Sequence, residues 1–233
     1  MNKEEFIKYV EKLNVDINEE ILNKLDKYFK LLVEWNNKFN LTTIIEENNV
    51  YLKHFYDSIA IVKSNLIENK EIKLCDFGTG AGFPGIIIKI FFSKINITLV
   101  ESNGKKCIFL NEVIKKLNLE KIEVINDRME IYSRINRESF DIVTCRAVSH
   151  LKVISELGIP LLKNNGYFLP LKSNVNEEII ESKDILNKLN SKIEDIISYE
   201  LPIEHSKRNI LIIRKLKETN IKYPREYNKI IKK

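Results

Sequence analysis

The segment from Asp76 to Gly85, DFGTGAGFPG, contains four of the chain's seven glycines within eight residues. Glycine at this density lets the backbone adopt positive φ angles, or lets a ligand approach where a Cβ atom would collide. An apolar strand precedes the turn and an apolar helix begins near Pro84. Free N–H groups and the positive end of the helix dipole then favour an anionic or hydrogen-bond-accepting group. We therefore expect this turn to bind a ligand.

Asp76 places a carboxylate beside the same turn. A purely phosphate ligand would gain little from it, whereas a ligand that carries both a cation and a carboxylate would, and S-adenosylmethionine is such a ligand. The string Gly80 to Gly85 also fits the G-x-G-x-x-G pattern of dinucleotide sites. Glu101 ends the next predicted strand, where either cofactor presents ribose hydroxyls to an acid. The residues thus favour an adenosine cofactor and leave NAD open beside S-adenosylmethionine.

Apolar segments and amphipathic helices alternate along the chain after residue 70. Seven segments are predicted to be strands, namely residues 72–77, 97–100, 122–125, 140–145, 167–171, 192–199 and 209–214. Helices are predicted between them, from about residue 84 and over residues 105–117, 150–163 and 175–189. This alternation is typical of an α/β fold with a mainly parallel sheet. The last two strands are joined by a short link through Pro202, which favours antiparallel pairing at one edge.

The N-terminal part is predicted to be helical, over residues 3–40 and 50–62. Apolar residues recur there at spacings of three and four, so the helices need a partner surface, most simply the flank of the α/β core. Ser58 lies near His54 on the second of these segments, but the chain has no G-x-S-x-G motif. We therefore interpret Ser58 as a packing or hydrogen-bonding residue.

Ligands of open α/β sheets bind across the carboxyl ends of the strands. The groups that end strands here are residues 76–82, residues 101–103, residues 127–130 and Arg146. We expect them to line one crevice, with the first three groups holding the cofactor. Arg146 is expected at the substrate entrance or over the amino-acid end of the cofactor. The alternative is an ion pair with Asp76 or Glu101 that only closes the crevice.

The charge is unevenly distributed. Within a net charge of +5, residues 207–233 contain ten Lys or Arg against two Glu. A concentrated positive end fits a phosphate-backbone partner, and the alternative is a solvated terminus. Three widely spaced cysteines without a C-x-x-C argue against a disulfide framework or a zinc site and favour a reducing cytoplasm. Neither a membrane span nor a signal peptide is predicted.

Eight short motifs resemble those of one bacterial enzyme family. They are W-N-x-x-x-N-L-T at 35–42, H-x-x-D-S at 54–58, D-x-G-T-G-A-G-F-P-G at 76–85, E-S at 101–102, K-K-x-x-F-L at 105–110, R-x-E at 128–130, R-A-V at 146–148 and Y-P-R at 223–225. Together they span nearly the whole chain and resemble RsmG, the guanine-N7 methyltransferase family of small-subunit ribosomal RNA, also called glucose-inhibited division protein B. The F-P-G end of the turn is the specific part.

This resemblance implies a class I S-adenosylmethionine-dependent methyltransferase fold, which is a Rossmann-like, mostly parallel seven-stranded sheet with an N-terminal helical extension. It divides the chain into the extension (1–65), the core (66–216) and a basic tail (217–233). Glu101 would bind the cofactor's ribose, Met129 and Glu130 would flank its adenine, and Arg146 would lie beside its methionine part. The full set of expected cofactor contacts is Asp76, Gly78, Gly80, Phe83, Glu101, Met129, Glu130 and Arg146. The expected RNA contacts are Lys207, Arg208, Lys222 and Arg225.

The implied reaction transfers a methyl group from S-adenosylmethionine to N7 of a guanine in 16S ribosomal RNA, guanine 527 of the 530 loop by the resemblance. We expect a cytoplasmic protein, taken as a monomer, and the resemblance implies that it acts on 16S rRNA or the small ribosomal subunit. Guanine N7 carries an exposed lone pair, so no base must first remove a proton. Orientation of the two reactants can supply up to ~7–11 kcal/mol.

No catalytic base, nucleophile or metal site is expected, and Arg146 is the candidate for substrate positioning. Cys145 lies inside an apolar strand and lacks the adjacent proline of cytosine-C5 methyltransferases, so we predict a buried core thiol. Two other functions stay open. One is a small-molecule methyltransferase with the same cofactor crevice, and the other is a non-catalytic RNA-binding factor for ribosome assembly.

Overall fold

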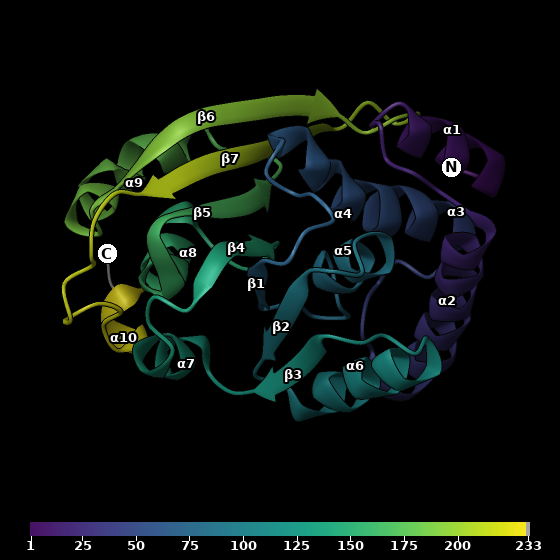
Figure 1. Ribbon diagram of the computed structural model, residues 1–233, viewed down its shortest axis with the longest axis horizontal. Coiled ribbons are helices and arrows are strands. Elements are labelled where there is room, and N and C mark those ends of the chain that lie inside the picture. The colour runs from purple at the N-terminus through teal and green to yellow at the C-terminus, as the bar shows by residue number, and fades with distance from the viewer. Residues whose placement is uncertain (232–233) are drawn as a thin grey trace.

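A seven-stranded sheet runs through the molecule, with helices on both of its faces (Figure 1). The computed structural model describes residues 1–231. The strands are β1 (Lys73–Phe77), β2 (Asn96–Glu101), β3 (Ile122–Asn126), β4 (Phe140–Arg146), β5 (Leu162–Lys172), β6 (Ser191–Glu200) and β7 (Lys207–Lys215). Their order is β3-β2-β1-β4-β5-β7-β6. The predicted α/β class and mainly parallel sheet are confirmed.

The direction of each strand decides where functional residues meet. Strands β1 to β5 run parallel to one another, while β7 is antiparallel to both β5 and β6. Phe77 of β1 is in register with Val100 of β2, and Asp76 is in register with Thr144 of β4. The carboxyl ends of β1, β2 and β4 therefore lie at one edge of the sheet.

The ten helices differ in length, and the longest, α2, has a clear amphipathic pattern and defined ends within the described residues. They are α1 (Lys3–Glu11), α2 (Glu19–Phe39), α3 (Glu47–Asn49), α4 (Asp57–Ile59), α5 (Gly85–Phe91), α6 (Gly104–Lys116), α7 (Met129–Ile135), α8 (Leu151–Gly158), α9 (Asn176–Lys188) and α10 (Tyr227–Ile230). The side chain of Asn18 caps α2 by accepting from the N–H of Ile21 at 2.9 Å. Asn40 ends this helix in the left-handed conformation.

Two apolar clusters, one on each face of the sheet, hold the fold together. One includes the N-terminal helices, α5, α6 and the facing side chains of the strands. The other includes α8, α9 and part of residues 216–231, which we call the C-terminal segment. Tyr28 of α2 is fully buried in the first cluster, where its ring stacks with Phe55, Phe83 and Phe109. The N-terminal helices thus share one core with the glycine turn.

Three local details differ from the sequence-based prediction. Residues Val50–Tyr56 form a π-helix that leads into α4, and α7 was not predicted. The helix predicted over 150–163 ends at Gly158, and β5 already begins at Leu162. Pro160 explains this early end, because its ring clashes with the carbonyl four residues earlier and it has no N–H to donate.

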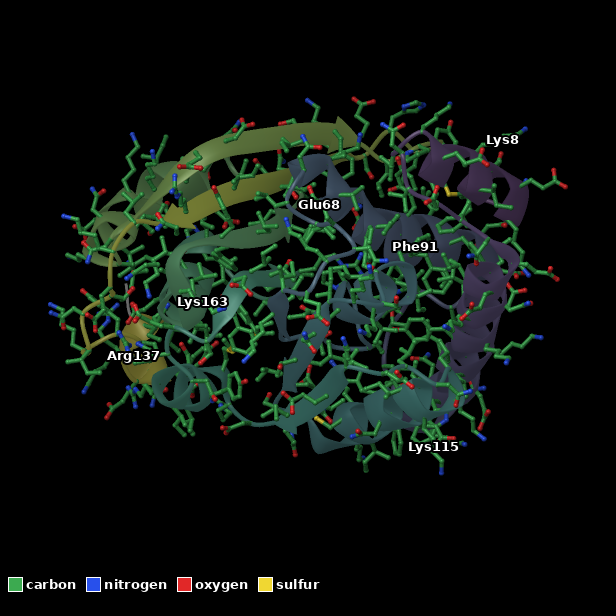
Figure 2. All side chains as sticks on the ribbon, in the orientation of Figure 1. Lys8, Glu68, Phe91, Lys115, Arg137 and Lys163 are labelled. Atoms are coloured by element: carbon green, nitrogen blue, oxygen red, sulfur yellow. The ribbon has the colours of Figure 1, made fainter. Side chains whose placement is uncertain are left out.

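The C-terminal segment packs onto the fold. Tyr223 and Ile230 are buried, and Arg137 donates to the carbonyl oxygens of Thr219 and Tyr223. Figure 2 shows Arg137 beside this segment, whereas Lys8 and Lys115 point outward at the periphery. Lys232 and Lys233, part of the predicted basic tail, lie outside the described residues. Over residues 1–231, no helix is both long and apolar enough to cross a membrane.

Candidate functional site

The glycine turn after β1 is organised by Asp76. Its Oδ2 accepts hydrogen bonds from Thr79 Oγ1 at 2.6 Å and from the N–H of Gly85 at 2.8 Å. A Cβ atom on Gly85 would lie 2.8 Å from this oxygen, so only glycine lets the helix start approach the carboxylate so closely. The aspartate and the last glycine of the motif therefore form one structural unit.

The other oxygen of Asp76 has no hydrogen-bond partner among the described residues, although the side chain is fully buried. Burial raises the pKa of this carboxyl from 3.8 to about 7, against the opposing effects of the Thr79 and Gly85 hydrogen bonds. A buried, unpaired carboxylate oxygen is costly unless a donor reaches it. The ammonium group of S-adenosylmethionine is such a donor, so this residue fits the expected cofactor.

Glu101, at the end of β2, lies across the turn from Asp76. Its side chain is nearly buried and accepts from the N–H of Gly80 at 3.0 Å and from the N–H of Asn103 at 2.8 Å. Gly80 and Gly78 both have φ near +60°, and a Cβ atom on Gly78 would lie 2.7 Å from Val148. The turn is thus bounded by Glu101 on one side and by the loop after β4 on the other.

Met129 and Glu130 begin α7, directly after β3. Met129 is half-buried against the apolar cluster that contains α8, and Glu130 pairs with Arg128 at 3.3 Å. The Arg128 guanidinium lies over the ring of Tyr227, 5.4 Å from its centroid. The C-terminal helix α10 therefore packs beside the residues expected to flank the adenine.

Arg146 is held by the N-terminal segment. Its Nη1 donates to Asp57 Oδ2 at 3.1 Å and to the carbonyl oxygen of Lys53 at 3.0 Å, and its guanidinium lies 5.3 Å from the ring centroid of Phe83. The alternative ion pair with Asp76 or Glu101 is absent among residues 1–231. The carboxylate partner is Asp57, whose role the sequence analysis did not predict.

Asp57 is the centre of a wider network. Its Oδ1 accepts from the Tyr199 hydroxyl at 3.0 Å and lies 3.4 Å from Nε of Arg208. One nearly buried carboxylate thus bridges two arginines, one from the end of β4 and one from the start of β7. The only sequence signal was the H-x-x-D-S motif, which places acidic and imidazole groups among apolar neighbours.

His54 packs between the turn and Arg146. Its ring stacks on Phe83 with centroids 4.5 Å apart, and its two nitrogens lie 3.0 Å from Thr42 Oγ1 and 3.3 Å from Nη2 of Arg146. Burial, with the nearby Arg146 charge, lowers the pKa of this imidazole to about 3. His54 is therefore neutral at physiological pH and can accept a hydrogen bond from the guanidinium. Ser58 donates to the His54 carbonyl, which confirms its predicted hydrogen-bonding role.

A cavity of ≈ 490 Å³ opens over the carboxyl ends of β4 and β5, next to the glycine turn. Charged groups from Lys53, Asp57, Arg146, Lys172 and Arg208 line it, and Val148 separates it from Gly78. Of the strand-end groups that were predicted to line one crevice, Arg146 lines this cavity, whereas Asp76 is fully buried and Glu101 nearly so.

Comparison with known proteins supports one family. The family model described as rRNA small subunit methyltransferase G, GidB, matches residues 21–211. The ribosomal RNA small subunit methyltransferase G of Bacillus licheniformis is 45% identical over 230 residues, covering 97% of this chain and 95% of the relative. The protein of the same name from Staphylococcus epidermidis is 47% identical over 206 residues, covering 87% and 85%.

The chain belongs to the GidB family.

Solved structures agree on the fold. A SAM-dependent methyltransferase from Aquifex aeolicus has a TM-score of 0.53 at 17% identity, covering 73% of this chain and 94% of that one. TrmN from Thermus thermophilus has a TM-score of 0.55 at 11% identity, covering 71% and 53%. The predicted class I methyltransferase fold of this GidB-family chain is confirmed.

Cys145 lies at the floor of the cavity in this GidB-family protein. The residue is 1% exposed, and burial raises the pKa of its thiol. A neutral, buried thiol is a poor nucleophile. This environment is that of the core cysteine predicted from the sequence.

The four predicted RNA contacts fall into two places. Arg208 lines the cavity and Lys207 precedes it, whereas Lys222 and Arg225 belong to the C-terminal segment. The Arg225 guanidinium donates to both carboxylate oxygens of Glu156, at 2.8 Å and 2.7 Å, and Glu156 is 0% exposed. Arg225 therefore neutralises a buried carboxylate on α8.

Proposed function

We propose that this protein transfers the methyl group of S-adenosylmethionine to N7 of a guanine in 16S ribosomal RNA, by the family resemblance guanine 527 of the 530 loop. Membership of the GidB family supports both the ribosomal RNA substrate and the methyl transfer. We further propose that the protein acts as a cytoplasmic monomer on 16S rRNA or on the small subunit.

The observation that carries this proposal is the pair of acids at the ends of β1 and β2. Asp76 offers an unpaired carboxylate oxygen, and Glu101 offers its carboxylate beside Gly80. An ammonium group and a ribose are the two parts of S-adenosylmethionine that such acids bind. NAD has a ribose but no ammonium group, so the unpaired oxygen of Asp76 favours S-adenosylmethionine.

The residues present suit a reaction that depends on orientation. S-adenosylmethionine supplies an electrophilic methyl group on a sulfonium, and guanine N7 supplies the lone pair. Arg146 is fixed by Asp57, Lys53 and His54, so it enters the reaction pre-oriented. Its remaining N–H groups would position the substrate or the methionine part of the cofactor. A fixed donor costs no reorganisation when the reactants meet.

The decisive experiment maps N7-methylguanosine by mass spectrometry in 16S rRNA from cells with and without this protein. We expect the modification at one guanine to disappear without the protein and to return with purified protein and S-adenosylmethionine. Unchanged methylation in the deleted strain would contradict the proposal. Calorimetry with S-adenosylhomocysteine and with NAD separates a methyltransferase from a non-catalytic assembly factor and from a dinucleotide-binding protein.

A further inference from the structure

A second hollow adjoins the cavity beyond Arg146. It has a volume of ≈ 840 Å³ and lies between the loop after β5 and the facing ends of β6 and β7. The two hollows share Ser173, Asn174 and Arg208 in their linings. They form one groove that runs from the carboxyl end of β4 to the outer strands, and we call it the β5–β7 groove.

We propose that the β5–β7 groove binds the single-stranded RNA that flanks the target guanine. The guanine itself would occupy the ≈ 490 Å³ cavity lined by Arg146, which we call the inner cavity. The proposal rests on the proposed function and adds the path of the RNA strand. It favours Lys207 and Arg208 over Lys222 and Arg225, since neither of the latter lines the groove.

The floor of the groove is polar and fixed. Asn209 is nearly buried, donates to the Ser173 carbonyl at 2.8 Å and accepts from the Ser198 hydroxyl at 2.7 Å. This chain of contacts ties the loop after β5 to strands β6 and β7. Serine and asparagine side chains beside it, including the exposed Asn174, offer donors and acceptors to phosphates and 2′-hydroxyls.

The charges of the groove favour an anion. Five cationic side chains line it (Lys53, Arg146, Lys172, Lys207 and Arg208), against three carboxylates (Asp57, Glu178 and Glu200). Four of these cations already have an acidic partner. Lys207 is exposed and, within residues 1–231, forms no ion pair, so its ammonium group is available to a phosphate.

The inner cavity requires an unpaired base. Its lining reaches the buried side chains of Cys145 on β4 and Leu171 on β5. A base within a duplex cannot reach such a recessed position without leaving the stack. The strand in the outer groove must therefore be single-stranded at least next to the target.

The test compares two exposed lysines beside β7. Lys207 opens the strand at the groove, and Lys217 follows its opposite end, where it is likewise exposed and has no ion pair within residues 1–231. The affinity of full-length Lys207→Ala and Lys217→Ala for a fluorescent single-stranded 16S rRNA fragment is measured at several salt concentrations. S-adenosylhomocysteine affinity and thermal unfolding are measured alongside.

We expect Lys207→Ala to weaken RNA binding roughly fivefold and to reduce the salt slope by about 0.7, the loss of one phosphate contact on a single strand. Lys217→Ala should bind RNA like the wild type. A second variant, Asn174→Asp, adds a negative charge where the hollows join and should also weaken RNA binding. Cofactor affinity and stability should be unchanged in all three.

If Lys207→Ala and Asn174→Asp both bind RNA with wild-type affinity, the groove is not the RNA-binding site. The same conclusion follows if Lys217→Ala loses as much RNA affinity as Lys207→Ala. Tighter binding of a fully paired duplex would overturn the single-stranded path. These results leave the proposed function intact whenever the wild-type protein still methylates 16S rRNA, and a wild-type protein without that activity contradicts the function itself.

Discussion

The cations at the carboxyl edge of the sheet and those near the C-terminus differ in what their side chains contact. At the carboxyl edge, Arg146 and Arg208 share one carboxylate and face a cavity. In the C-terminal part, Lys215 is 0% exposed and bonded to Glu138, while Arg225 covers the buried Glu156. In the sequence, Arg208, Lys215 and Arg225 all belong to the basic stretch 207–233. The structure distinguishes cations that line a cavity from cations that pair with buried or partly buried carboxylates elsewhere in the fold.

Arg225→Ala tests the stabilising group and should have the largest effect. The substitution leaves the carboxylate of Glu156 buried without its partner, so the free energy of unfolding should fall by about 3 kcal/mol. Urea denaturation measures this change. Lys222→Ala, in the same segment but exposed, should stay within about 0.5 kcal/mol of the wild type. Wild-type stability with weakened RNA binding in Arg225→Ala would place Arg225 in the ligand-facing group instead.

Asp57→Ala tests the ligand-facing group. Without its carboxylate, Arg146 and Arg208 lose a common anchor, and kcat/KM for 16S rRNA should fall roughly 30-fold, about 2 kcal/mol of transition-state stabilisation. Asp57→Asn keeps the shape and should lose less. Steady-state methylation kinetics measure the effect, with circular dichroism as the check on folding. An unchanged kcat/KM would show that Arg146 needs no anchor.

Asp76 extends the comparison to a buried acid. Burial raises its pKa from 3.8 to about 7. Between these two pH values the Asp76 carboxyl is protonated in the folded protein and ionised in the unfolded chain. The resulting stability is present below the unfolded pKa near 4 and is lost as the pH rises through about 7.

The ionised form of Asp76 binds an ammonium group, so the affinity for S-adenosylhomocysteine should rise several-fold between about pH 6 and pH 7.5. In Asp76→Asn, calorimetry should find this pH dependence gone; its persistence would assign it to another group.

Cys145→Ser should have the smallest effect. The thiol is neutral and buried, so methyl transfer should stay within about threefold of the wild type. Single-turnover methylation measures this rate. Complete loss of transfer with cofactor binding intact would show a covalent mechanism.

Local pattern predicted most of the fold. The strands from β1 to β5 and helices α5, α6 and α8 follow from apolar periodicity, and the turn after Asp76 follows from glycine spacing. The position of β7 between β5 and β6 was not predicted, because strand order depends on pairing between segments far apart in the chain. Helix α7 was missed because seven residues give barely two turns of periodicity.

The site was predicted only in part. The carboxyl ends of parallel strands lie at one edge of a sheet, so Asp76, Glu101 and Arg146 could be placed at that edge from their positions at strand ends. The partner of Arg146 could not, because Asp57 is 89 residues away in sequence. The ion pair of Arg225 could not be predicted for the same reason, because its partner Glu156 is 69 residues away in sequence. Such pairings are set by how elements pack, which spacing along the chain does not record.

The hydroxyl of Tyr28 on α2 donates to the carbonyl oxygen of Ala81 inside the glycine turn, and its ring stacks on Phe83 and Phe109. During translation the N-terminal helices emerge first, yet this aromatic stack is incomplete until Phe109 has left the ribosome. The helices must therefore remain without their full apolar cover while the next seventy or so residues are synthesised. A shortened protein that begins after α2 would leave Phe83 and Phe109 without this partner and would expose the underside of the glycine turn.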